Sequence, residues 1–125
     1  MRLNPDCMRD ILLVAEDQVP LNSSLSMGSL LSSLPNYSKD ELTYTCLKLN
    51  EGNLLNISKM NSDNAISVAC ISDITYEGHQ FLENIRNQST WETVKQKLSL
   101  LGSSSVPVIM SVASQVILNK ISSSL

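Results

Sequence analysis

The spacing of apolar residues predicts a helix near the start of the chain. In residues 5–18, apolar side chains recur every three or four positions, which is typical of a helix with one buried face. Asn4 is suited to cap this helix, and Pro5 fits its first turn. Pro20 ends the pattern, and a shorter helix is expected over residues 29–34.

A second clear helix is predicted over residues 39–51. Ser38, with Glu41 three residues later, forms a capping box, in which each side chain bonds the backbone N–H of the other residue. Gly52 is suited to the C-cap. One stripe of this helix is apolar and is expected to be buried: Leu42, Cys46 and Leu49.

Alternating apolar and polar residues then predict two β-strands joined as a hairpin. The strands span residues 54–60 and 65–71, and the polar tetrapeptide 61–64 between them is typical of a turn. Successive side chains of a strand point to opposite faces, so one face of the hairpin is expected to be buried. The apolar residues expected on that face are Leu55, Ile57, Ile66, Val68 and Cys70.

The segment ITYEGHQFLENIR, residues 74–86, links this hairpin to the rest of the chain. Thr75 is expected to cap a helix that begins at Tyr76. Gly78 lies inside that helix, where glycine is unfavourable, so we expect another backbone to approach it closely. The residues predicted to be buried are Phe81, Leu82 and Ile85.

Two further helices complete the predicted elements. Ser89 is expected to cap the first, which carries Trp91, Val94 and Leu98. Gly102 and three serines form a joint before the last helix, over residues 106–122.

This order of elements predicts an α+β, mainly helical fold that contains a winged helix-turn-helix. We expect residues 1–87 to form the winged-helix domain, with the helix 39–51 as the recognition helix and the hairpin as the wing. Residues 88–125 are expected to form a C-terminal helical oligomerisation segment. The side chains predicted to contact nucleic acid are Lys39, Thr43, Tyr44, Lys48, Lys59 and Asn61. The alternative is an ordinary solvated helix face and turn.

Three stretches of the sequence also resemble a known family. They are RLNPDCMRDILLVAE, YSKDELTYTCLKLNEGNLL and ISDITYEGHQFLENIRNQSTWETVKQKL. They resemble a family of unknown function, found in Gram-positive bacteria, their prophages and their phages. Its members carry L-N-P-D-C-x-R-D-I-L and I-T-x-x-G-H-x-F-L-x-x-I-R motifs. The resemblance covers essentially the whole chain and implies a winged-helix-like domain with added C-terminal helices. It implies no activity, substrate or catalytic residue.

Charge narrows the classes of function. The net charge of −3 counts against strong non-specific binding to nucleic acid, which depends on many lysines and arginines at the phosphates. The nine basic residues are also scattered along the chain. The low charged fraction of 17% favours self-association.

The candidate chemical groups are few. Cys7, Cys46 and Cys70 lie in apolar patterns without a C-x-x-C spacing, so we expect reduced thiols in a reducing cytoplasm. The N-terminus has no apolar run of the signal-peptide type. The one histidine, His79, has no partner at a diagnostic spacing, so we expect a structural role at the start of its helix. The sequence predicts no enzyme activity, no metal site and no cofactor.

The last helix is apolar on more than one side, more than a chain of this size is expected to cover. Burial against a second subunit explains this better than a membrane span does, because the stretch is short and contains several polar residues. The residues predicted to form the contact are Val108, Ile109, Val112, Val116, Ile117 and Ile121.

Two hypotheses of function follow from these patterns. The first is a small phage- or prophage-type winged-helix regulator in the cytoplasm, which binds DNA as a homo-oligomer. The alternative is a non-enzymatic protein that binds a host protein or a small ligand, for example one that interferes with a host defence. The acidic net charge favours the alternative, and the order of elements favours the first.

Overall fold

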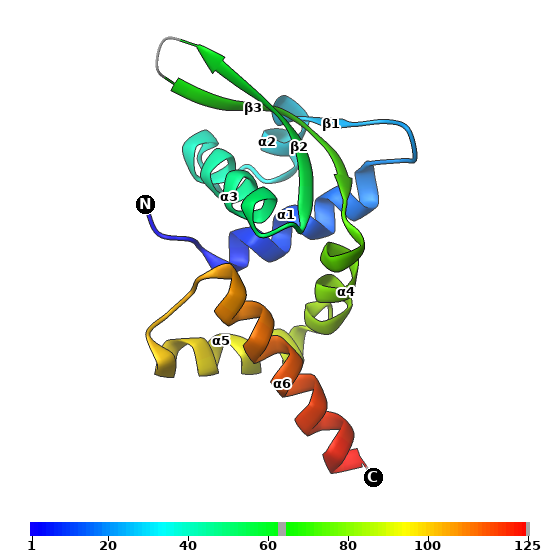
Figure 1. Cartoon of the computed structure of the whole chain (residues 1–125), viewed down its shortest axis with the longest axis vertical. Coiled ribbons are helices and arrows are strands. Elements are labelled where there is room, and N and C mark those ends of the chain that lie inside the picture. Colours follow the sequence, from blue (N-terminus) through cyan, green and yellow to red (C-terminus); the bar gives the residue numbers. More distant parts are fainter. Residues whose placement is uncertain (63–64, 125) are drawn as a thin grey trace.

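Within residues 1–62 and 65–124, which the computed structural model describes, the chain forms six helices and a three-stranded antiparallel sheet (Figure 1). The first helix, α1, spans Pro5–Gln18. Its N-cap is Asn4, as predicted, and the Asn4 side chain accepts the backbone N–H groups of Asp6 and Cys7. The buried stripe of α1 consists of Cys7, Met8, Ile11, Leu12 and Ala15.

A short strand that the sequence pattern did not predict lies after α1. This strand, β1, spans Leu25–Ser26, and the helix α2 follows directly at Met27–Ser33. The helix begins two residues before the predicted start because Ser26 caps it, accepting the backbone N–H of Ser29. A two-residue strand has no periodic pattern of its own, so only its partner in the sheet identifies it.

The helix α3 spans Lys39–Glu51, as predicted, and Ser38 accepts the backbone N–H of Glu41. The other half of the predicted capping box is replaced by a contact between helices. The Glu41 carboxylate accepts a hydrogen bond of 2.9 Å from Asn4 Nδ2, and this contact joins the starts of α1 and α3. Gly52 is the C-cap with φ −82°, and the left-handed residue is Asn53, with φ 62°.

The hairpin consists of β2, Leu55–Ser62, and β3, Ala65–Ile74, and the strands lie in the order β1-β3-β2. Residues 63–64 of the predicted turn lie outside the described residues. The predicted buried face is partly wrong: Val68 is buried, but Ile66 is 57% exposed. Two irregularities in the β2–β3 register break the strict alternation. The sheet buries Ile71 and Ile74 instead.

Three helices follow the sheet: α4 at Tyr76–Ile85, α5 at Gln88–Leu101 and α6 at Val106–Ser124. Thr75 caps α4, as predicted. The predicted cap of α5 is wrong: the cap is Asn87, whose side chain accepts the backbone N–H of Thr90 at 3.0 Å. Ser89 therefore lies inside the helix. The predicted buried residues of α5 are confirmed: Trp91, Val94 and Leu98.

One hydrophobic core connects the sheet, α1 and the C-terminal helices. The helix α1 lies beside α4 (Figure 1), and polar contacts join α1 to the segment where α4 ends and α5 begins. Arg9 donates to the carbonyl oxygens of Ile85 and Arg86 at 2.9 and 2.8 Å. The indole N–H of Trp91 donates to Asp6 at 2.8 Å. These contacts hold the end of α4 and the start of α5 against α1.

Candidate functional site

The outward face of α3 carries four of the side chains that the sequence predicted as contacts. Lys39 is exposed at the start of the helix, whereas Thr43, Tyr44 and Lys48 are half-buried. This face of α3 points outward because the residues on the opposite side of the helix are buried in the core. Its residues at a spacing of three or four therefore point away from the core together.

Lys48 is already engaged by neighbours on its own helix. Its Nζ lies 2.9 Å from Glu51 Oε2 and 5.4 Å from the centre of the Tyr44 ring. The hydrogen bond to the Glu51 carboxylate raises the pKa of Lys48 above its ordinary value. The lysine is fully charged at neutral pH, but Glu51 offsets that charge at the surface. Lys48 therefore contributes less positive potential to this face than the sequence suggests.

The other two predicted contacts lie on the hairpin. Lys59 and Asn61 are exposed on β2, which extends away from the helices (Figure 1). Lys39 and Lys59 form no ion pair within the part of the chain that the structure describes. Met60 and Ile66 are each 57% exposed on the same hairpin, so its surface is more apolar than the sequence pattern predicted.

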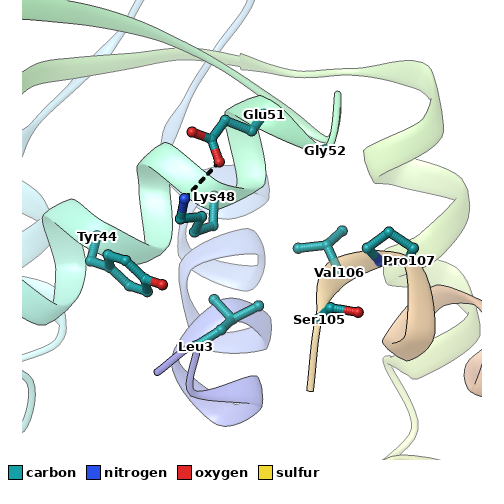
Figure 2. A pocket seen from close by; sticks show the side chains of 8 residues that line it. All are labelled: Leu3, Tyr44, Lys48, Glu51, Gly52, Ser105, Val106 and Pro107. Carbon is teal, nitrogen blue, oxygen red and sulfur yellow. Dashed lines mark hydrogen bonds and ion pairs between the residues drawn. The ribbon is translucent and has the colours of Figure 1, made fainter. Parts of the chain in front are cut away.

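An open pocket of about 340 Å³ lies between α3 and the start of α6 (Figure 2). Its walls come from three distant parts of the chain, and sequence patterns did not reveal it. Its lining residues are Leu3, Tyr44, Lys48, Glu51, Gly52, Ser105, Val106 and Pro107. Figure 2 shows Leu3, Tyr44 and Val106 directed toward one space, with Lys48 above it.

Gly52 is the small residue that allows α6 to start at this place. A Cβ atom on Gly52 would lie 2.8 Å from Val106 Cγ1, closer than real Cβ atoms approach a neighbour. Val106 is itself buried, at 7% exposure. The sequence marked Gly52 only as a helix cap, and its second role depends on the position of α6.

The residues predicted to contact a second subunit on α6 fall into two groups. Ile109 and Val116 are buried at 0% and 2% exposure, in the chain's own core. The prediction for these two is corrected, because α6 packs them toward α4 and α5. Val108, Val112 and Ile117 are half-buried. Ile121 is 51% exposed, and Leu118, one turn earlier on α6 and not among the predicted contacts, is 57% exposed.

By length and composition alone, residues 106–123 of α6 would also suffice to cross a membrane. This property is weak support for a span, because core helices of soluble proteins share it. In this chain 22% of the stretch is buried, namely Val106, Ile109, Ala113 and Val116.

The segment 74–86 serves as a junction between the sheet and α4. Gly78 is buried, and a Cβ atom there would overlap the carbonyl oxygen of Leu54, so the predicted close backbone approach is confirmed. His79 is exposed on α4. Arg86, at the end of α4, binds Glu16 of α1 through two hydrogen bonds of 2.8 and 2.6 Å. These hydrogen bonds lower the pKa of Glu16.

The thiols and carboxylates of the described residues do not cluster into a metal site. Cys7 and Cys46 are buried, and Cys70 is half-buried. Burial raises the pKa of Cys7 to about 11 and that of Cys46 to about 12, so both are neutral thiols at pH 7. In residues 1–62 and 65–124, no three side chains of His, Cys, Asp or Glu gather in a group that could hold a metal ion.

Comparison with known proteins places the chain in a family. The family described as "Hypothetical protein (DUF2513)" matches residues 2–104. An "Uncharacterized protein" of Haemophilus influenzae is 30% identical over 96 residues, which cover 76% of each chain. No solved structure matches the chain. The match confirms the expectation of a family of unknown function. The chain belongs to the DUF2513 family of hypothetical proteins.

Proposed function

We propose that residues 1–87 form a winged-helix domain and that the protein is a small DNA-binding regulator without enzyme activity. The order α1-β1-α2-α3-β2-β3, with the sheet order β1-β3-β2, supports this proposal. In a winged helix, the third helix is the recognition helix and the hairpin beside it is the wing. We also propose a phage or prophage origin, because the sequence motifs resemble those of a family found in phages and prophages.

The proposed DNA contacts are of two kinds: charged lysines and neutral side chains that form hydrogen bonds. Lys39 on α3 and Lys59 on β2 are exposed and supply positive charge for phosphates. Thr43, Tyr44 and Asn61 supply hydrogen-bonding groups for sugar or base edges. Because Lys48 is held by Glu51, its contribution is smaller. With so few free cations, binding is expected to be weak and to be lost as salt increases.

A fluorescence-anisotropy titration with a labelled random duplex of about 30 base pairs, at about 50 mM salt, tests the proposal. We expect saturable binding, and we expect the double variant Lys39→Glu/Lys59→Glu to lower the affinity by about tenfold or more. Lys97→Glu is the control, compared with Lys39→Glu and Lys59→Glu singly so that each variant reverses one charge, because Lys97 is an exposed lysine on α5, outside the proposed contacts. Equal losses in the control and the two single variants would refute the assignment of the contacts.

We further propose that the chain acts as a homo-oligomer through the far end of α6. Figure 1 shows this end of α6 extending past α5 and the rest of the chain. Ile117 is half-buried and Leu118 is 57% exposed there, so apolar area remains to be covered. Light scattering after size exclusion is expected to give a mass above that of one chain. Leu118→Glu is expected to lower it, and Gln115→Glu on the same helix is not. A monomeric wild-type protein would refute this proposal.

A second candidate function is recognition of a host protein without nucleic acid. The observation that favours it is the exposed apolar surface of the hairpin at Met60 and Ile66, on an acidic chain. Interfaces with proteins are commonly apolar at their centre and depleted of lysine. If the folded wild-type protein shows no binding in the low-salt DNA titration, this second candidate replaces the first.

A further inference from the structure

The pocket between α3 and α6 combines an apolar interior with one ion pair at its edge, between the Lys48 ammonium group and the Glu51 carboxylate. Leu3, Val106 and Pro107 supply aliphatic walls, and Tyr44 adds an aromatic ring. The Lys48 ammonium lies at the edge, and its partner Glu51 has a side chain that is 61% exposed. The volume of about 340 Å³ falls within the range of small-molecule sites, about 300–1,000 Å³.

The walls of the pocket are fixed by packing that does not depend on a ligand. Val106 is packed against Gly52, where an added Cβ atom would lie 2.8 Å from Val106 Cγ1. Ser104 donates a hydrogen bond of 3.3 Å to the carbonyl oxygen of Leu3, so the N-terminal arm is tied to the segment before α6. Preformed walls lower the entropic cost of binding a small molecule.

The contact between Lys48 and Glu51 is the part of the pocket that can change. Both groups are at the surface, where an ion pair of this kind contributes little to stability. Because 61% of the Glu51 side chain is exposed, Glu51 can turn into solvent, and a carboxylate from a ligand can then take its place at the Lys48 ammonium group without a large loss. A ligand without charge would gain the apolar contacts but no ion pair.

We infer that this pocket binds a small organic anion: a molecule with an apolar body of about one ring and one carboxylate. The apolar body lies among Leu3, Val106 and the Tyr44 ring, and the carboxylate pairs with Lys48. Such a ligand contacts α3 and α6 at once. This inference goes beyond the proposed DNA binding and does not depend on it.

An NMR titration of the whole chain with phenylacetate, without DNA, tests the inference. The neutral analogue phenylacetamide, which has the same ring, is titrated in parallel. At ligand concentrations up to about 10 mM, we expect saturable shifts at the methyl groups of Leu3 and Val106 and at the Gly52 amide. We expect phenylacetate to bind about two- to fivefold more tightly than the amide, as one surface ion pair allows.

Two lysine variants separate the role of the charge from effects on the fold. Lys48→Met is expected to lower the affinity for phenylacetate to that for phenylacetamide and to leave the amide unaffected. Lys59→Met, outside the pocket, is expected to change neither. Because both lysines are at the surface, the two variants are expected to fold. Absent shifts at the pocket, shifts confined to other surfaces, or equal affinities for acid and amide would each overturn the inference. Loss of DNA binding alone would leave it intact.

Discussion

Gly78→Ala is expected to destabilise the protein, although alanine is the better residue in almost any helix. The added methyl group would overlap the carbonyl oxygen of Leu54 and come within 2.7 Å of Ile74 Cγ2. Carbon atoms in ordinary contact lie about 3.5–4.0 Å apart, so α4 would have to move by roughly 1 Å from the start of β2.

That movement would strain a small network of hydrogen bonds. The backbone N–H of Thr75 donates to Leu54, at 3.2 Å, and the Thr75 hydroxyl donates to Asn53, at 2.6 Å. The same hydroxyl accepts the N–H of Gly78, at 2.9 Å, as the cap of α4. Overpacking costs about 1–3 kcal/mol and a lost cap about 1 kcal/mol, whereas alanine regains about 1 kcal/mol of helix propensity. The expected net loss is about 1–3 kcal/mol.

Urea denaturation followed by circular dichroism measures this loss. With a slope of about 1–3 kcal/mol per molar urea, the midpoint is expected to fall by about 1 M. Gly28→Ala is the matched control, because its Cβ would meet only Ser26 Oγ, at 3.9 Å, and Gly28 also lies in a helix. The control is expected to be neutral or slightly stabilising. If both variants show the same midpoint as the wild-type protein, the close approach at Gly78 is wrong.

Three further predictions concern a helix cap and the thiols. Asn87→Ala is expected to lower the free energy of unfolding by about 1 kcal/mol, because it removes the cap of α5. Ser89→Ala is expected to change the free energy of unfolding by less than about half of that. Urea midpoints measure both effects, and a larger effect at Ser89 would show that Ser89 is the cap. In the folded protein at pH 8, iodoacetamide is expected to alkylate the half-buried Cys70 first, since burial raises the pKa of Cys7 to about 11 and of Cys46 to about 12. Mass spectrometry of the modified peptides measures this, and equal rates for the three thiols would contradict it. The pKa values of Cys7 and Cys46 in the folded protein lie above the ordinary thiol value of 9.0, so the folded state holds these protons more tightly than the unfolded chain does. The free energy of unfolding is therefore unaffected by these thiols below pH 9 and falls as the pH rises toward 11 and 12.

Local signals in the sequence predicted the helices well. Asn4, Ser38 and Thr75 each cap a helix at the predicted place, because a cap depends on a side chain and the backbone two or three residues away. The apolar stripes of α1 and α5 are buried as their periodicity indicates. The short strand β1 was missed, since two residues carry no period.

The site depended on contacts between distant segments. Tyr44 and Lys48 are neighbours on α3 by sequence spacing, but the pocket beside them needs Leu3 and Val106, which come from opposite ends of the chain. The sequence alone determined the starts of α1, α3 and α4 and which residues share a helix face, because both depend on neighbours along the chain. Only the tertiary structure decided that Ile66 is exposed, that Ile109 and Val116 are buried within the chain, and that Gly78 meets Leu54. Those outcomes depend on strand register and on the docking of α4 and α6, which no local pattern determines.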